Sequence, residues 1–167
     1  SGFFILCAHA LRPGQYIRVG GSEGTIVEIG MFSTWLRTGL GGDVLVPNSF
    51  ILANTLKSFS LSSGRGGFVL DTSVTIGYDA PWRQVEAMLL EAAKRVPAIA
   101  SSPAPYVIQT ALADFYVAYR LVASSDEAVP RQRMEVLNAL HAEIQDVFNE
   151  HGVQIMSPHY VLDPRAP

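Results

Sequence analysis

The chain is 167 residues long, which suits one large domain or two small ones. Charged residues make up only 16% of it and hydrophobic residues 49%, which favours an oligomer that buries part of its surface over the alternative, a well-packed monomer. The net charge of −3, with only two lysines, argues against nucleic-acid binding, because that binding depends on a basic face.

The chain begins with an apolar run, Phe3–Leu11, which is broken only by His9. The run is shorter than the ~20 residues that a helix needs to cross a bilayer, and it lacks the basic start and cleavage site of an ordinary signal peptide. We expect either a short helix that packs on the next module or the end of a longer apolar helix. Cys7 is the only cysteine, which excludes an intramolecular disulfide and a cysteine-rich metal site.

The next stretch, residues 15–60, predicts a small all-β module with the strand pattern of a barrel or sandwich. Pro47 ends its last strand, because proline cannot donate a ladder hydrogen bond. A short helical turn is expected over residues 49–54, with Asn48 or Ser49 as its cap. Strands are expected over residues 16–19, 25–29, 34–38 and 44–46, and glycine turns over residues 20–24 and 39–43.

Residues 61–67 predict a linker, because they are rich in serine and glycine and show no periodicity. Beyond it the expected order is strand, helix, strand, strand, helix, strand, which is the ferredoxin-like arrangement. Asp79 is expected to cap the first helix, with Pro81 in its first turn and Pro97 at its end. The expected strands cover residues 68–77, 106–115, 116–123, 153–155 and 159–162, and the second helix covers residues 131–151.

No pattern in the sequence predicts catalysis, a cofactor or a metal. The glycine turn at residues 20–24 has neither G-x-G-x-x-G nor G-K-[ST] spacing and opens no helix, so we assign it to turn geometry. Ser33, Ser49 and Ser73 do not lie in a G-x-S-x-G elbow. The histidines show no metal-ligand spacing among themselves; they are His9, His141, His151 and His159.

Four motifs follow one another in the β-module. They lie at Leu11–Ile17, at Gly21–Ile26, at Ser33–Thr38 (S-T-x-L-R-T) and at Val44–Ile51 (V-x-V-P-N). In this order and spacing they resemble the β-domain of the small-conductance mechanosensitive channel (MscS-like) family. Further along, residues 74–79 and 148–158 resemble two motifs of that family's carboxyl-terminal α/β domain. The chain departs from the family at residues 9 and 10, which are His-Ala where the family usually has Arg-Pro.

The resemblance implies an α+β fold in which a small Sm-like barrel at residues 12–60 precedes a ferredoxin-like α/β domain at residues 68–167. Residues 1–11 would be the end of a pore-lining helix. It also implies a homo-heptamer in which the β-domains form a ring beneath the pore and the α/β domains enclose a vestibule. Such a channel releases ions and small solutes when membrane tension rises in hypo-osmotic shock.

The resemblance further implies attachment to the inner (plasma) membrane through upstream helices absent from this chain, with this region on the cytoplasmic side. It implies no enzyme activity, no cofactor and no nucleic-acid partner. The remaining alternative is an RNA- or ligand-binding module built on the barrel and the ferredoxin-like domain. The acidic balance of the chain argues against that alternative.

Two groups of residues are singled out. Three aromatic residues are predicted to pack in or between β-domains of neighbouring subunits, with packing inside one subunit as the alternative: Phe32, Trp35 and Phe50. The motifs also assign structural positions to nine residues: Gly14, Gly21, Gly24, Ser33, Thr34, Arg37, Thr38, Pro47 and Asn48.

Overall fold

The computed structural model describes residues 11–60, 67–126 and 130–156, with the side chains of residues 130–132 left aside. The chain divides into two compact units. The first comprises Ser1–Leu70 together with Ser124–Val136, and the second Asp71–Ala123 together with Leu137–Pro167. Most of the predicted helix at residues 1–11, the predicted linker at 61–67 except Gly67, and the predicted strand at 159–162 lie outside the described residues.

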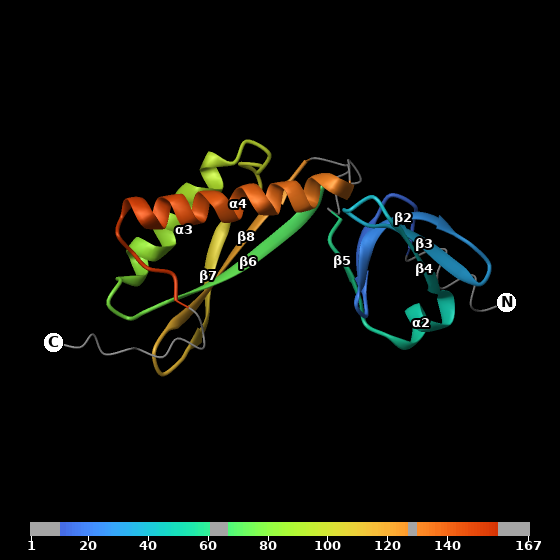
Figure 1. The fold of residues 1–167 in the computed structure, drawn as a ribbon, viewed down its shortest axis with the longest axis horizontal. Helices are drawn as coiled ribbons and strands as arrows, with labels where there is room; N and C mark the ends of the chain where they lie inside the picture. The colour runs from blue at the N-terminus through green and yellow to red at the C-terminus, as the bar shows by residue number, and fades with distance from the viewer. Residues whose placement is uncertain (1–10, 61–66, 127–129, 157–167) are drawn as a thin grey trace. The chain divides into compact units, whose positions relative to one another are not determined.

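A five-stranded antiparallel sheet forms the first unit (Figure 1, blue to cyan). Its strand order is β4-β3-β2-β1-β5, so β4 and β5 are the two edges recorded for the described residues. The short helix α2 (Asn48–Ala53) connects those two edges. The strands are β1 (Tyr16–Val19), β2 (Ser22–Ile29), β3 (Ser33–Arg37), β4 (Asp43–Pro47) and β5 (Leu56–Ser58).

The predicted alternation holds on β3, where Thr34 and Leu36 are buried while Trp35 and Arg37 are exposed. Successive residues of a strand point to opposite faces, so one face of the sheet supplies the core. That core is a single apolar cluster drawn from four strands, α2 and the entry to β1; its buried members are Leu11, Ile17, Val19, Ile26, Leu36, Val46 and Ile51.

The first hairpin turn is tighter than the sequence predicts. Val19 pairs directly with Ser22, so only Gly20 and Gly21 form the turn, and the predicted turn residues 22–24 belong to β2. Gly20 has a φ of +56°, which lets two residues reverse the chain. Gly24 serves the strand instead, because a Cβ there would lie 2.6 Å from the carbonyl oxygen of Arg37 on β3.

The prediction that Asn48 or Ser49 caps α2 is wrong. Pro47 occupies the N-cap position, and no side chain caps the helix. The buried Asn48 side chain turns to the β2–β3 connection instead: its Nδ2 donates to the carbonyl oxygens of Gly30 at 2.9 Å and Met31 at 3.2 Å. Its Oδ1 accepts from Thr34 Oγ1 at 2.8 Å. Asn48 therefore ties the start of α2 to the β2–β3 hairpin.

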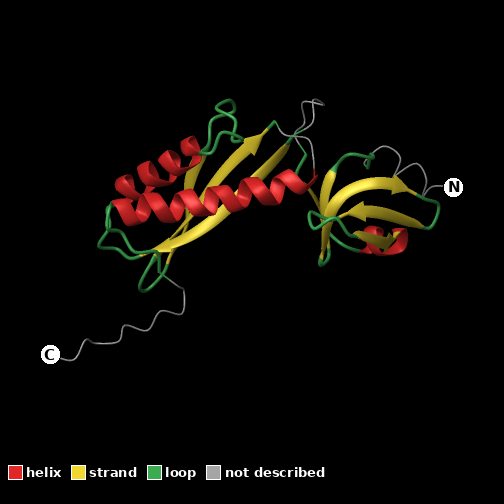
Figure 2. Cartoon of the chain, turned by 45° about the horizontal axis from the view of Figure 1, so that its top comes forward, coloured by secondary structure: helices red, strands yellow, loops and turns green. Residues whose placement is uncertain are grey.

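A three-stranded sheet, covered on one face by two helices, makes up most of the second unit (Figures 1 and 2). Its order is β6-β8-β7, and Ile155 forms an antiparallel bridge with Ile76 on β6. The predicted α+β class is confirmed, and the bridge puts the closing segment beside β6, as a ferredoxin-like order requires. The elements are β6 (Phe68–Ile76), α3 (Trp82–Arg95), β7 (Tyr106–Leu112), β8 (Val117–Ser125) and α4 (Pro130–Glu150).

The predicted cap of the first long helix is also wrong. Helix α3 begins at Trp82 and its N-cap residue is Pro81, without a side-chain cap from Asp79. The Pro81 carbonyl oxygen accepts from the backbone N–H groups of Gln84 and Val85 at 3.0 and 3.1 Å, which starts the helix after Asp79. The buried residues of the helix recur at helical spacing along one face: Val85, Met88, Leu89, Ala92 and Ala93.

We predict that Asn48→Ala lowers the free energy of unfolding by about 1–3 kcal/mol, because it leaves a buried hydroxyl and two carbonyl oxygens without their partner. Urea denaturation of the folded chain measures this change. Asn54→Ala is the matched control, since the Asn54 side chain donates to the Phe50 carbonyl oxygen at an exposed position. The control is expected to change stability by less than about 0.5 kcal/mol, and equal losses in both variants would contradict the role given to Asn48.

Candidate functional site

Large apolar side chains are exposed throughout the first unit. Phe32 is 81% exposed and Leu40 86%, and both lie in connections between strands. Scattered exposed apolar residues are ordinary, but many of them on one small unit indicate a surface that a partner covers. We call these residues the exposed apolar set; they are Val27, Met31, Phe32, Trp35, Leu40, Leu45, Phe50 and Leu52.

The sheet register brings part of this set together. Trp35 on β3 is the direct cross-strand partner of Leu45 on β4, so both side chains lie on the same outer face. Val27 is exposed because the β2–β3 pairing shifts register between Ile26 and Glu28, and a bulge leaves the extra residue unpaired. The inner face of the sheet holds the apolar core, and these strands also carry apolar side chains on the outer face.

The three aromatic residues singled out from the sequence have different environments. Phe32 is almost fully exposed, and Trp35 is 47% exposed on the outer face of the sheet. Phe50 is 41% exposed, and its ring packs against Gly20, where an added Cβ would lie 2.7 Å from the ring. Phe50 therefore packs partly inside its own unit. The sequence analysis missed five members of the set, although the alternation along β4 could have indicated Leu45; they are Val27, Met31, Leu40, Leu45 and Leu52.

Eight of the nine motif positions lie in strands of the first unit and the connections beside them, and Asn48 is the first residue of α2. Gly14 has a φ of +92°, and its N–H donates to the Ile26 carbonyl oxygen at 2.8 Å. Arg37 and Asp43 pair across the β3–β4 hairpin at 3.0 Å, and this hydrogen bond raises the pKa of Arg37. Thr38 Oγ1 donates to the Gly42 carbonyl oxygen at 3.0 Å inside the same loop.

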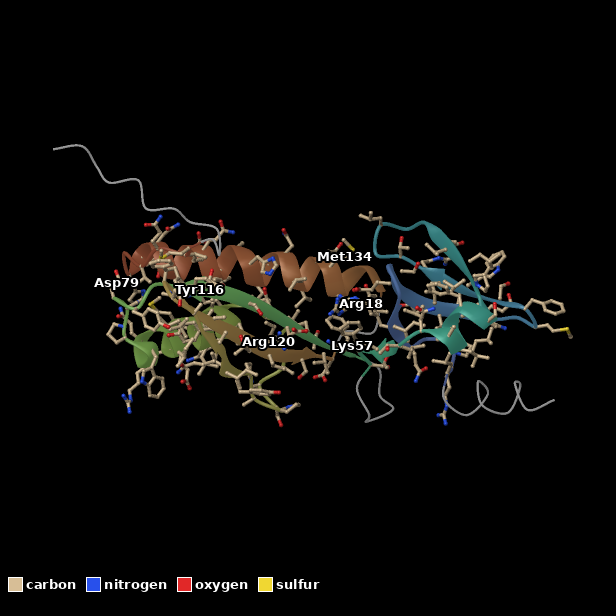
Figure 3. All side chains as sticks on the ribbon, turned by 90° about the horizontal axis from the view of Figure 1, so that it is seen from below. Arg18, Lys57, Asp79, Tyr116, Arg120 and Met134 are labelled. Carbon is tan, nitrogen blue, oxygen red and sulfur yellow. The ribbon has the colours of Figure 1, made fainter. Side chains whose placement is uncertain are left out.

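The first unit also contains a charged cluster around the Glu23 carboxylate, which the sequence analysis did not anticipate. Three donors reach this carboxylate: Tyr16 Oη at 2.8 Å, Arg18 at 2.6 Å and Arg133 Nη1 at 2.8 Å. The Phe59 ring lies beside it, with Arg18, Lys57 and Arg133 within 5.0 Å of its centroid. Arg18 on β1 and Lys57 on β5 lie directly opposite each other in the sheet (Figure 3).

Two open cavities, of about 690 and 550 Å³, lie in the second unit near the carboxyl-terminal end of α4, and the larger of these two carries the more polar lining. Its lining includes the carboxylates of Asp79 and Asp114, the rings of Tyr78 and Phe115, and His151. Within residues 11–60, 67–126 and 130–156 no group of three or more His, Cys, Asp or Glu residues could hold a metal ion. His141 instead lies 2.7 Å from Thr72 Oγ1, while His9 and His159 lie outside the described residues.

Comparison with known families matches both units. The family model described as the mechanosensitive ion channel β-domain matches residues 1–60, and the one described as the carboxyl-terminal domain of the mechanosensitive ion channel MscS matches residues 70–155. The chain therefore carries two domains of the mechanosensitive ion channel class. It belongs to the MscS family, as its sequence motifs predicted.

Two curated relatives are also described as mechanosensitive channels. The miniconductance mechanosensitive channel MscM of Escherichia coli is 25% identical over 97% of this chain and 14% of its own length. The small-conductance mechanosensitive channel of Edwardsiella ictaluri is 32% identical over 53% of this chain and 30% of its own length. The chain thus spans less than a third of either relative. In the part of the chain that the structure describes, no helix has the length and apolar character needed to cross a membrane.

Solved structures support the fold. The crystal structure of Helicobacter pylori MscS in its closed state matches with a TM-score of 0.62 and 15% identity, covering 99% of this chain and 64% of that one. The structure of Arabidopsis thaliana MSL1 matches with a TM-score of 0.58 and 16% identity, covering 93% of this chain and 56% of that one. These likenesses confirm the mixed α+β architecture.

In the Glu23 cluster, Tyr16 is expected to lose its proton at an unusually high pH. Burial, and then the hydrogen bond to Glu23, raise the pKa of Tyr16 to about 12. A folded-state pKa above the unfolded value of about 10 stabilises the fold below that pH, and this contribution is lost as the pH rises toward about 12. The ultraviolet absorbance of the wild type and of Tyr16→Phe is titrated with pH. The difference between the two curves should show one phenol with a midpoint near pH 12.

The same titration is repeated with Glu23→Gln. This substitution removes the negative charge beside the Tyr16 phenol, so the pKa of Tyr16 should be lower in that variant. If the difference between the wild-type and Tyr16→Phe curves has its midpoint at about pH 10, as for a free phenol, the geometry of the cluster is contradicted.

Proposed function

We propose that this chain forms the vestibule region of a mechanosensitive channel that releases ions and small solutes under membrane tension in hypo-osmotic shock. The observation that carries the proposal is the consecutive match of the family's β-domain and carboxyl-terminal domain over residues 1–60 and 70–155. In this proposal the first unit forms a ring beneath the pore, and the second unit frames the vestibule through which solutes pass. The chain contributes no catalytic step and holds no cofactor.

The proposal puts tension sensing outside this chain. Tension favours an open pore because the open state occupies more membrane area, so the sensing segments must lie within the bilayer. The curated relatives are much longer than this chain, which leaves room for such segments in the complete protein. We therefore propose attachment to the inner (plasma) membrane through upstream helices, with the region described by this chain on the cytoplasmic side.

The exposed apolar set supports assembly of identical subunits. Removing apolar surface from water contributes ~25 cal/mol per Å², and side chains as exposed as Phe32, Trp35 and Leu45 have much area to bury. We propose that these residues, with the exposed part of Phe50, pack between neighbouring β-domains of a homo-heptamer. The nine motif positions would then keep the hairpins in the shape that presents this surface.

The channel proposal is tested with the complete protein that contains this chain. Excised membrane patches should show currents that open with suction, and cells lacking other such channels should survive hypo-osmotic shock when they express it. A complete protein that reaches the membrane but shows no tension-activated current contradicts the proposal. Salt-dependent binding of labelled RNA by the isolated chain would favour the RNA-binding alternative instead.

The assembly proposal makes a separate prediction for the chain itself. Size-exclusion chromatography with light scattering should give a mass several times that of the 18.1 kDa monomer, and Phe32→Ser with Leu45→Ser should lower it toward one subunit. Leu112→Ser is the matched control, because Leu112 is 73% exposed on β7 of the second unit. A monomer at every concentration contradicts self-association of this chain, and equal loss in the control contradicts the assignment of the surface.

A further inference from the structure

One arginine is buried in the first unit although it comes from a distant part of the sequence. Arg133 is 4% exposed and belongs to the beginning of α4, in the segment Ser124–Val136 that is part of the first unit. It pairs with Glu23, which precedes it by 110 positions. A buried cation is costly unless charge and hydrogen-bond partners replace the water it loses.

The first unit supplies those partners on several sides of the guanidinium. Nη1 donates to Glu23 Oε1 at 2.8 Å, and Nε donates to the Val69 carbonyl oxygen at 3.4 Å. The centroid of the Phe59 ring lies 4.0 Å from Arg133 Cζ, and that of the Tyr16 ring lies 5.1 Å away. A carboxylate, a carbonyl oxygen and two aromatic rings are the groups that recognise a planar guanidinium.

Groups other than Arg133 already hold the Glu23 carboxylate. Tyr16 Oη donates to Oε1 at 2.8 Å and Arg18 Nε to Oε2 at 2.6 Å, and both residues lie on β1, paired with β2. Two strands of one hairpin therefore orient this acceptor without help from α4. Arg18 contacts the same carboxylate, but its side chain is 48% exposed whereas that of Arg133 is 5% exposed.

We propose that the first unit carries a guanidinium-binding site, formed by Glu23, Phe59, Tyr16 and the Val69 carbonyl oxygen, which Arg133 occupies within the same chain. Occupancy makes Arg133 at the beginning of α4 a required part of this unit, which is not complete at residue 60, where the β-domain match ends. The same contacts couple the start of α4 to the β1–β2 hairpin. This inference does not depend on the channel proposal.

The experiment empties the site and refills it with a small molecule. Arg133→Ala in the full chain should speed hydrogen exchange of the β1–β2 amides about tenfold or more, because the Glu23 carboxylate and the Phe59 ring lose their buried partner. Millimolar ethylguanidinium should recover most of the lost protection. Ethylammonium at the same concentration carries the same charge and the same alkyl group without the planar fork, and it should recover little.

Two variants separate recognition from general stability. Arg37→Ala removes an exposed arginine from its Asp43 partner elsewhere in the same unit and should change exchange much less, with no response to ethylguanidinium. Glu23→Gln combined with Arg133→Ala removes the charge that binds the cation and should abolish the rescue. If Arg133→Ala does not fold in buffer, the refolding yield with ethylguanidinium against ethylammonium becomes the readout. If ethylguanidinium and ethylammonium restore protection or refolding equally, or if neither restores it, the proposal is overturned.

Discussion

The Glu23 carboxylate is the point on which the first unit depends. It binds a phenol and a guanidinium from β1 and a second guanidinium from the start of α4, so one side chain joins a hairpin to a segment far along the sequence. The burial of Arg133 sets the strength of this constraint, because its cation has exchanged water for the carboxylate and the ring of Phe59. Any movement of the beginning of α4 must therefore break these contacts or carry the β1–β2 hairpin with it.

A second constraint concerns where the apolar residues of this hydrophobic chain lie. The inner face of the first sheet is filled by one cluster, and a further set of large apolar side chains on its strands and loops is exposed. The Trp35–Leu45 pair and Phe32 show this outward placement most clearly. The solvent cost of such a surface is the physical link between the fold and the proposed assembly, because packing against identical subunits would remove it.

Two of the motif residues have structural roles that other side chains would not fill. Gly24 cannot accept a side chain, since a Cβ would clash with the Arg37 carbonyl oxygen on the neighbouring strand. Asn48 satisfies two carbonyl oxygens and a buried hydroxyl at once, which few other side chains can do. These positions control the β2–β3 and β3–β4 connections, whereas apolar core positions need only similar size and pattern.

The sequence by itself determined four of the five strands of the β-module, the ferredoxin-like order of the second unit, the long helices and the family, because these depend on local alternation, helical spacing and short motifs. It gave the wrong turn at residues 22–24 and the wrong caps at Asn48 and Asp79, since several nearby residues can serve each role and only packing selects one. Only the tertiary structure decided which apolar residues remain exposed. It alone brought Arg133 to Glu23, because a pair separated by 110 positions leaves no periodic signal in the chain.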